Sequence, residues 1–255
     1  MPQFASYPSL AGRPVFVSGG GSGIGASIVE HFAEQGAKVG FVDIDEAVSV
    51  ALVDRIKAAG HPAPLFAKAD VRDLPAYQAT IDGMAGKLGA FKVLVNNAAR
   101  DDRHTIDQVT PAFWDERIAV NLRHQYFAIQ SVVPGMKKAG GGSIINFSSV
   151  SYHAMAPQLS VYQAAKAAVI GMTRGLARDL GPDNIRLNSL TPGWIMTQRQ
   201  IDLWLTPKAE AALMVAQCLK EKVYPPDIAR MVLWLAADDS RLVTAQNFVV
   251  DGGRM

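Results

Sequence analysis

The chain has little cysteine and no long apolar run. Cys218 is the only cysteine among 255 residues, so no disulfide can form within the chain, and a reducing compartment such as the cytoplasm is the expected location. No uncharged stretch reaches the roughly 18 apolar residues of a membrane span. The first twenty residues also lack the basic and apolar regions of a secretion signal. We therefore expect no membrane association.

Metal-ligand spacing and concentrated basic charge are also missing. The five histidines are scattered, so no metal site is expected, and His104 and His124 are expected in loops or subunit contacts. The net charge of +2 comes from dispersed basic residues, so no nucleic-acid partner is expected. With 49% apolar and 19% charged residues, the chain is typical of globular proteins. We expect one domain over residues 1–255, with residues 1–10 as an N-terminal extension.

Apolar runs of strand length alternate with segments of helical spacing. The expected strands are 15–17, 38–42, 64–68, 92–96, 143–147, 185–190 and 247–250. The expected helices lie near 24–35, 46–59, 75–88, 111–138, 160–180, 207–218 and 226–237, with Thr110 and Pro111 at the start of the fourth. This alternation predicts a doubly wound α/β fold, whose seven parallel strands end at one edge, where ligands bind.

A glycine-rich turn follows the first expected strand. Residues 18–25 read SGGGSGIG and precede a segment of helical spacing. Glycines permit positive φ and let the backbone approach a pyrophosphate, whose charge is met by the amides at the helix start. A plain tight turn is the alternative. Asp43 argues against it, because this residue ends the next strand eighteen positions beyond Gly25, close to where a carboxylate meets the adenosine ribose of a dinucleotide.

The charge around Asp43 favours NAD over NADP. A carboxylate accepts hydrogen bonds from free ribose hydroxyls and repels a 2′-phosphate. No lysine or arginine occurs between Ser18 and Gly25 or directly after Asp43. Lys38 stands at the start of the same strand, where its side chain is better placed to reach solvent at the sheet edge than to reach the ribose.

Ser149, Tyr162 and Lys166 form a constellation suited to proton transfer. Tyr162 and Lys166 are four apart in an expected helix and so share one face, where the ammonium can lower the pKa of the phenol. Ser149 adds a hydroxyl thirteen positions earlier. By itself a tyrosine–lysine pair of this spacing is usually an accidental surface pair. Its occurrence in a chain that also carries a dinucleotide-binding turn indicates a hydride-transfer enzyme that uses Tyr162 as the base.

These motifs resemble those of the short-chain dehydrogenase/reductase family. The family's Thr/Ser-Gly-x3-Gly-x-Gly pattern is matched from Ser18 to Gly25, and its Asn-Asn-Ala-Gly pattern is nearly matched by residues 96–99. Pro192-Gly193 and the terminal residues 250–253 also fit, so the resemblance covers residues 10–255. It implies a single Rossmann-type domain with helices on both faces of the sheet. It also implies a homotetramer, assembled through the helix before Gly140 and the helix that carries Tyr162.

The resemblance assigns roles to individual residues. It implies a catalytic set of Asn121, Ser149, Tyr162 and Lys166, in which Asn121 holds a water against Lys166 and Ser149 orients the substrate hydroxyl. A polar residue such as Asn121 or Ser149 can instead serve only the local backbone. The implied NAD-binding residues are Ser18, Gly19, Ser22, Gly23, Ile24, Gly25, Asp43, Ile44, Asp70, Val71, Asn97, Ala98, Tyr162, Lys166, Pro192, Gly193, Ile195 and Thr197.

Several further segments resemble bacterial NAD-dependent aldose 1-dehydrogenases, among them residues 101–104, 114–117 and 121–124. This resemblance implies oxidation of the C1 hydroxyl of an aldose, for example a pentose such as D-xylose or L-arabinose, to its lactone. A sugar site needs directional polar groups and an apolar wall. Residues 193–222 are expected to cover the substrate. The candidate substrate-binding residues are Asn97, Ser149, Ser151, His153, Gln158, Tyr162, Trp194, Gln198 and Arg199.

Other functions remain compatible with parts of the pattern. The substrate can be another polyol, a deoxysugar, a hydroxy acid or a keto-deoxy sugar acid. A noncatalytic NAD-binding sensor is disfavoured, because such a protein is expected to lack at least one of the four catalytic groups. A reductase acting on acyl carrier protein is disfavoured because neither NADP preference nor a basic docking patch is evident.

Overall fold

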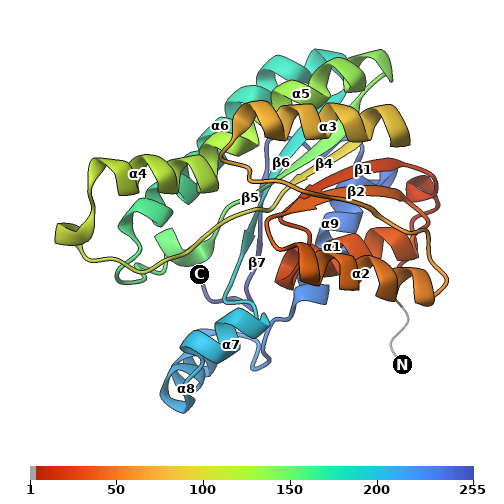
Figure 1. Cartoon of the computed structure of the whole chain (residues 1–255). Coiled ribbons are helices and arrows are strands. Elements are labelled where there is room, and N and C mark those ends of the chain that lie inside the picture. The colour runs from red at the N-terminus through yellow and green to blue at the C-terminus, as the bar shows by residue number, and fades with distance from the viewer. Residues whose placement is uncertain (1–3) are drawn as a thin grey trace.

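A seven-stranded parallel sheet forms the centre of the computed structural model, which describes residues 4–255 (Figure 1). The strands are β1 (Pro14–Ser18), β2 (Lys38–Asp43), β3 (Leu65–Lys68), β4 (Val93–Asn96), β5 (Gly142–Phe147), β6 (Ile185–Pro192) and β7 (Asn247–Val250). Their order is β3-β2-β1-β4-β5-β6-β7, and every neighbouring pair is parallel. All seven expected strands are confirmed. Residues 1–3 of the expected N-terminal extension lie outside the described residues.

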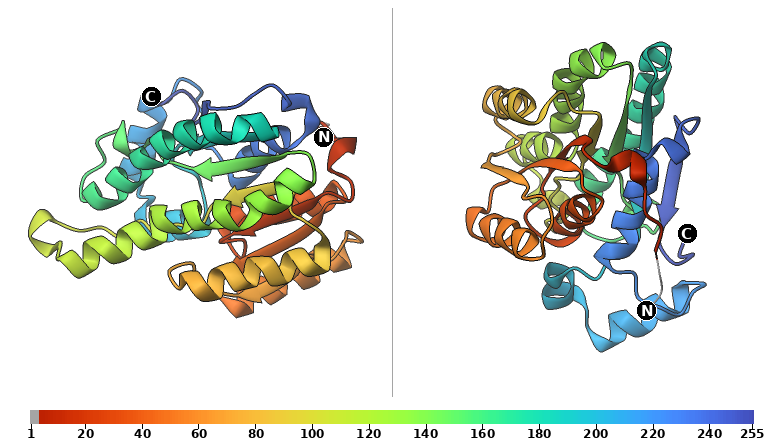
Figure 2. Two further views of the ribbon diagram at one scale, coloured as in Figure 1. Left: turned by 90° about the horizontal axis from the view of Figure 1, so that it is seen from above. Right: turned by 90° about the vertical axis from the view of Figure 1, so that its right-hand side faces the viewer.

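Helices cover both faces of this sheet (Figures 1 and 2). They are α1 (Gly23–Glu34), α2 (Glu46–Ala58), α3 (Leu74–Leu88), α4 (Pro111–Ile118), α5 (His124–Lys138), α6 (Ser160–Leu180), α7 (Gln198–Trp204), α8 (Pro207–Ala216) and α9 (Pro225–Ala236). Buried side chains of α1, α2 and α9 form one apolar core with the sheet, and side chains of α3, α5 and α6 contribute to a second. The predicted doubly wound architecture is confirmed.

The helical structure differs from expectation in two places. The segment expected as one helix over 111–138 begins as predicted, with the Thr110 side chain accepting from the amide of Phe113, but residues 119–123 form a π-helical turn between α4 and α5. Helix α7 was not expected. It begins directly after Thr197, whose hydroxyl accepts from the amide of Gln200, and its seven residues bury no apolar face that would give a helical pattern.

The chain order places a crevice at one edge of the sheet. Strand β1 lies between β2 and β4, so successive connections leave it toward opposite sides, and ligands bind at such a switch point. Beyond β6 the chain departs at Ile195 and returns at Val223, which form an isolated parallel bridge. Helices α7 and α8 lie between them and project from the body of the molecule (Figure 1). Within residues 4–255, no helix has the length and apolar character needed to cross a membrane.

Candidate active site

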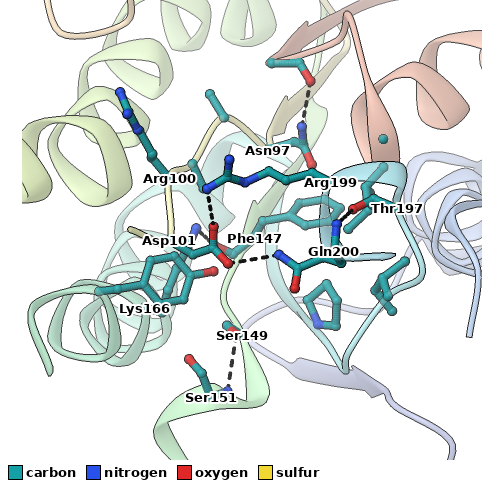
Figure 3. Close-up of a pocket in the computed structure, with 18 of the residues that line it drawn as sticks. Asn97, Arg100, Asp101, Phe147, Ser149, Ser151, Lys166, Thr197, Arg199 and Gln200 are labelled. Atoms are coloured by element: carbon teal, nitrogen blue, oxygen red, sulfur yellow. Dashed lines mark hydrogen bonds and ion pairs between the residues drawn. The ribbon is translucent and has the colours of Figure 1, made fainter. Parts of the chain in front are cut away.

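A cavity of about 880 Å³ opens at the carboxyl ends of the central strands. It collects residues from the turn after β1, the ends of β2, β4, β5 and β6, and helices α6 and α7 (Figure 3). Every residue expected to bind the cofactor lines this cavity except Ser18, and so do three of the four expected catalytic residues, Ser149, Tyr162 and Lys166. Motifs separated by up to about 180 positions thus meet in one place.

Glycines shape one end of the cavity. A Cβ atom on Gly25 would lie 1.8 Å from the carbonyl oxygen of Gly19, and one on Gly19, whose φ is +66°, would lie 2.8 Å from Cα of Ala98. Either added atom would overlap the backbone. The turn therefore depends on glycine to bring α1 against β1, and it leaves the amides at the start of α1 open to an anionic group, which fits a dinucleotide pyrophosphate.

Ser18 and Asn97 hold the glycine turn from behind. The Ser18 hydroxyl accepts from the amides of Asn97 and Ala98 at 3.1 and 3.2 Å, which joins the ends of β1 and β4. The Asn97 side chain donates to the carbonyls of Ser18 and Gly19 at 3.2 and 2.8 Å. Ser18 is fully buried, so it positions the turn and does not line the cavity.

Asp43 lies at the end of β2, as expected. One carboxylate oxygen accepts from the amide of Gly21 at 2.9 Å, and the other accepts from the amide of Asp45 at 3.0 Å. These contacts orient the carboxylate beside the glycine turn while leaving further acceptor capacity, because each oxygen can accept more than one hydrogen bond. The exposed side chain of Ile44 follows at the cavity wall. The arrangement fits an adenosine ribose with free hydroxyls.

Lys166 is buried beneath Tyr162 on α6. Its ammonium donates to the carbonyl of Phe147 at 2.8 Å and lies 5.6 Å from the centre of the Tyr162 ring. Burial lowers the pKa of Lys166 to about 7, and the negative charge of Asp101 partly opposes this lowering. Lys166 thus releases a proton near neutrality and can relay protons at the floor of the cavity.

The pKa of Tyr162 lies above its ordinary value, which is opposite to the lowering by Lys166 that the sequence predicted. Burial of the phenol is the main cause, and the Asp101 carboxylate adds to it. A hydrogen bond with Ser149 and the charge of Arg103 act in the other direction. The physical reason is that loss of hydration disfavours the charged phenolate, and this effect of burial outweighs the stabilising contacts.

Asn121 sits in the π-helical turn and is fully buried. Its side chain accepts from the amide of Arg100 at 2.9 Å and donates to the carbonyls of Arg100 and Arg117 at 3.0 and 2.9 Å. These contacts fix the chain directly after β4, where Arg100 lines the cavity. Asn121 itself does not line it, so the side chain serves the local backbone, which was the alternative interpretation of this residue.

The substrate end contains most of the expected residues and several others. Asn97, Ser149, Ser151, Tyr162, Trp194, Gln198 and Arg199 line the cavity. Lining residues that were not named as substrate candidates include Arg100, Asp101, Arg103, Gln200, Trp204 and Arg254, of which Asp101 and Arg103 lie in the segment 101–104 that resembles aldose 1-dehydrogenases. The Asp101 carboxylate joins this set to α7, because it accepts from Gln200 Nε2 at 2.9 Å and from Arg199 Nη2 at 3.4 Å (Figure 3).

Three residues lie differently from expectation. His153 and Gln158 are exposed and do not line the cavity, although Ala154 and Pro157 of the same loop do, and their binding of the substrate stays a prediction. His124 is fully buried and its Nε2 lies 3.0 Å from the carbonyl oxygen of Ala98, so it is not a loop or surface residue. Burial, with the charge of Lys166, lowers the pKa of His124 to about 3 and keeps it neutral. His104 is also buried, in the loop between β4 and α4.

The described chain, residues 4–255, contains no group of three or more His, Cys, Asp or Glu side chains placed to hold a metal ion. The polar groups of the cavity include hydroxyls, amides, guanidinium groups, carboxylates, indole N–H groups and the Lys166 amine. Such groups suit proton transfer and the binding of a polar organic molecule.

Comparison with known proteins gives consistent matches. Residues 19–254 match the family model described as Enoyl-(Acyl carrier protein) reductase. The chain is 49% identical over 249 residues to the probable galactose dehydrogenase GalD of Rhizobium meliloti, covering 98% of this chain and 97% of that protein. It is 48% identical over 250 residues to D-xylose 1-dehydrogenase of Caulobacter vibrioides, covering 98% of each. The crystal structure of a 3-oxoacyl-[acyl-carrier protein] reductase with bound NAD from Brucella melitensis superimposes with a TM-score of 0.89 at 30% identity, covering 100% of this chain and 98% of that one.

Proposed function

The chain belongs to the short-chain dehydrogenase/reductase family, and on that premise we propose that it is an NAD-dependent aldose 1-dehydrogenase that oxidises the C1 hydroxyl of an aldose to its lactone. The enzyme class follows from the family, since its members here are oxidoreductases acting on CH–OH groups. The observation that carries the substrate class is near-50% identity over almost the whole chain to two sugar dehydrogenases. A pentose or hexose aldose is therefore the first substrate to test.

The chemistry requires a base for the sugar hydroxyl and an acceptor for the hydride. A bound oxidised nicotinamide supplies the hydride acceptor and a positive charge near the phenol. Tyr162, as phenolate, takes the proton from the hydroxyl. Ser149 lies beside Tyr162, where its hydroxyl favours the phenolate, and it orients the sugar hydroxyl. The proton passes toward Lys166, whose pKa near 7 allows it to exchange protons at neutral pH.

The role proposed for Asn121 follows from its position. Both N–H groups of its side chain donate to the backbone and its oxygen accepts from the amide of Arg100, so we propose that a water in the relay is held by other atoms of the π-helical turn. A main-chain carbonyl freed by the irregular turn is the natural acceptor. We therefore assign Asn121 the task of stabilising this turn beside Lys166.

The preference for NAD rests on Asp43. Its carboxylate faces the glycine turn and accepts a hydrogen bond from the amide of Gly21. In this position its negative charge would repel the 2′-phosphate of NADP. The cavity carries arginines, but those are Arg72 beyond β3 and a group near α7, not the residues that follow Asp43. A free ribose, which donates hydrogen bonds to a carboxylate, is the matching ligand.

Residues 193–222 are proposed to form the cover of the substrate. The segment leaves and rejoins the body at the Ile195–Val223 bridge, and Asp101 ties α7 across the cavity through Gln200. Thr197 packs against the glycine turn, since a Cβ on Gly23 would lie 3.1 Å from its methyl carbon. The cover thus contacts both ends of the cavity.

A homotetramer in the cytoplasm is the proposed state of the protein. Small residues of α6, namely Ala164, Ala168 and Gly171, are exposed, whereas Ala165 faces the interior. The exposed set permits close packing against a second helix. The alternative, that all these residues face the sheet, holds only for Ala165. Sedimentation velocity of the purified protein tests the assembly.

Profiling of NAD reduction across neutral aldoses, deoxysugars, polyols and sugar acids tests the proposed substrate class. We expect turnover with at least one of D-galactose, D-xylose and L-arabinose, with a lactone as the product. Turnover of a keto-deoxy sugar acid without turnover of any free aldose would contradict the proposal. Parallel assays with NADP test the cofactor, and a kcat/KM for NADP equal to that for NAD would contradict the role of Asp43.

A further inference from the structure

Three hydrogen-bond donors in the substrate end of the cavity have no partner. Among residues 4–255, the buried polar atoms that lack a hydrogen-bond partner include Arg103 Nε, Ser151 Oγ and Trp204 Nε1. All three residues line the cavity, although they come from the loop after β4, the 3₁₀ turn after β5 and the end of α7. Buried polar groups in folded proteins are normally paired, so donors unpaired together at a cavity indicate a missing ligand.

The three residues are held in place by other contacts. The Arg103 guanidinium carbon lies 4.8 Å from the centre of the Trp204 ring, which connects the loop after β4 to α7. Arg103 also donates through Nη1 to the carbonyl of Pro157 at 3.3 Å. The charge of Arg103 acts on the Tyr162 phenol, lowering its pKa, so the cluster lies close to the reacting group. These contacts occupy other atoms and leave the three donors free.

The complementary ligand carries several oxygen acceptors within reach of Tyr162. Each donor loses its hydration on burial and regains a partner only when an acceptor enters the cavity. The hydroxyl and ring oxygens of a sugar supply such acceptors, and the Trp204 and Trp194 rings supply an apolar wall. The Asp101 carboxylate is an acceptor, so it can accept hydrogen bonds that the sugar hydroxyls donate.

We propose that Arg103, Ser151 and Trp204 form a donor cluster that binds the sugar oxygens remote from C1 and thereby determines which sugars are accepted. This inference rests on the proposed function, because it assigns the part of the substrate that the catalytic residues do not touch. It assigns specificity to α7 and the loop after β4, which were not expected from the sequence to act together.

Trp204→Phe and Ser151→Ala test the cluster. Phenylalanine keeps an aromatic ring while removing Nε1, and alanine removes only the hydroxyl. We expect each change to raise the KM for the best aldose about tenfold while kcat and the KM for NAD change less than about twofold, since one neutral hydrogen bond is lost. Trp114→Phe, at an exposed tryptophan outside the cavity, is the matched control and should leave all three constants unchanged.

Monodeoxy sugars identify the hydroxyl that each donor binds. In the wild-type enzyme, the sugar that lacks the contacted hydroxyl should bind about tenfold more weakly than its parent. In Trp204→Phe or Ser151→Ala, the parent sugar and one of its deoxy analogues should bind equally well. The variant already lacks the donor that contacts the hydroxyl at that position, so loss of the hydroxyl has no further effect. Calorimetric titration of the same sugars into NAD-loaded Tyr162→Phe protein gives the Kd without turnover.

The outcomes separate this inference from the proposed function. If the wild-type enzyme oxidises an aldose and both variants keep its KM and the same discrimination against every deoxysugar, the donor cluster does not bind the sugar. A kcat that falls as far as KM rises would also overturn it, because that result indicates a disturbed reacting centre. If the wild-type enzyme oxidises no aldose, the proposed function fails and the inference fails with it.

Discussion

The two ends of the cavity are built from different parts of the chain. At the cofactor end, glycines after β1 and main-chain amides at the start of α1 form the surface, and the charged side chain of Asp43 is directed at the turn. At the substrate end, the surface consists of side chains from loops and from α7, joined by Asp101, Arg199 and Gln200. Tyr162 and Lys166 lie where the two ends meet.

This difference separates affinity for a common cofactor from selectivity for a particular substrate. A surface made of backbone presents the same groups whatever the neighbouring side chains are, but it tolerates no added atom. A surface made of side chains changes with each substitution, and its effects are graded. We therefore expect severe effects from changes at the glycine turn and selective effects from changes around Asp101.

The largest effect is expected where the two ends meet. Tyr162→Phe removes the proton acceptor and should lower kcat by about 10³-fold or more, within the range known for general base catalysis. The Kd for NAD should change less than about threefold, because the ring is kept. Rates of NADH formation and NAD titrations measure the two quantities. Tyr152→Phe, at a tyrosine outside the cavity lining, is the control. Wild-type-like turnover in Tyr162→Phe would contradict the role of Tyr162 as the base.

The glycine turn should respond strongly to a single methyl group. Gly25→Ala would place Cβ 1.8 Å from the Gly19 carbonyl oxygen, so the turn must move, and we expect NAD binding to weaken by at least about tenfold. Gly83→Ala is the control: no heavy atom lies within 4 Å of its added Cβ on the exposed side of α3. That change should stabilise the fold by about 0.5–1 kcal/mol. Calorimetry and thermal melting measure both. Equal NAD affinity in the two variants would contradict the steric argument.

Asp43→Ala tests the charged contact of the cofactor end. Loss of the carboxylate should weaken NAD and remove repulsion of NADP, shifting the preference by about 1–3 kcal/mol toward NADP. Asp45→Ala, at the N-cap of α2, controls for general loosening of this segment. The ratio of kcat/KM values for the two cofactors is the measurement. An unchanged ratio in Asp43→Ala, or the same shift in Asp45→Ala, would count against the ribose contact.

A smaller, pH-dependent effect is expected at Asp101. Its carboxylate raises the pKa values of Tyr162 and Lys166, so Asp101→Asn should lower both. The active base form of Tyr162 is then populated at lower pH, and the rising limb of log(kcat/KM) should move toward acid. Asp202→Asn, on the exposed side of α7, should leave the profile in place. A shift toward alkali in Asp101→Asn would contradict the sign of this electrostatic effect.

The two ends also differ in how far the sequence predicts them. The glycine turn, Asp43 and the strand ends are local patterns whose geometry follows from backbone sterics, and the structure places them as expected. The contact between Gln200 and Asp101 joins residues 99 positions apart, which no local pattern indicates. Helix α7 was missed because it is short, buries no apolar face and has its start fixed by a side-chain cap. His153 and Gln158 lie outside the lining while Ala154 and Pro157 lie within it, because the course of an irregular loop follows from no periodic pattern in the sequence.

The central claim is that the enzyme oxidises C1 of an aldose, with NAD as the hydride acceptor and Tyr162 as the base. The most direct measurement is nuclear magnetic resonance of the product formed from a sugar labelled with carbon-13 at C1, with NAD and wild-type enzyme. We predict that the label appears in the carbonyl of a lactone, followed by the corresponding aldonate, in step with NADH formation. A label that remains at an unoxidised anomeric carbon while NADH accumulates would show that another hydroxyl is oxidised and would contradict the account.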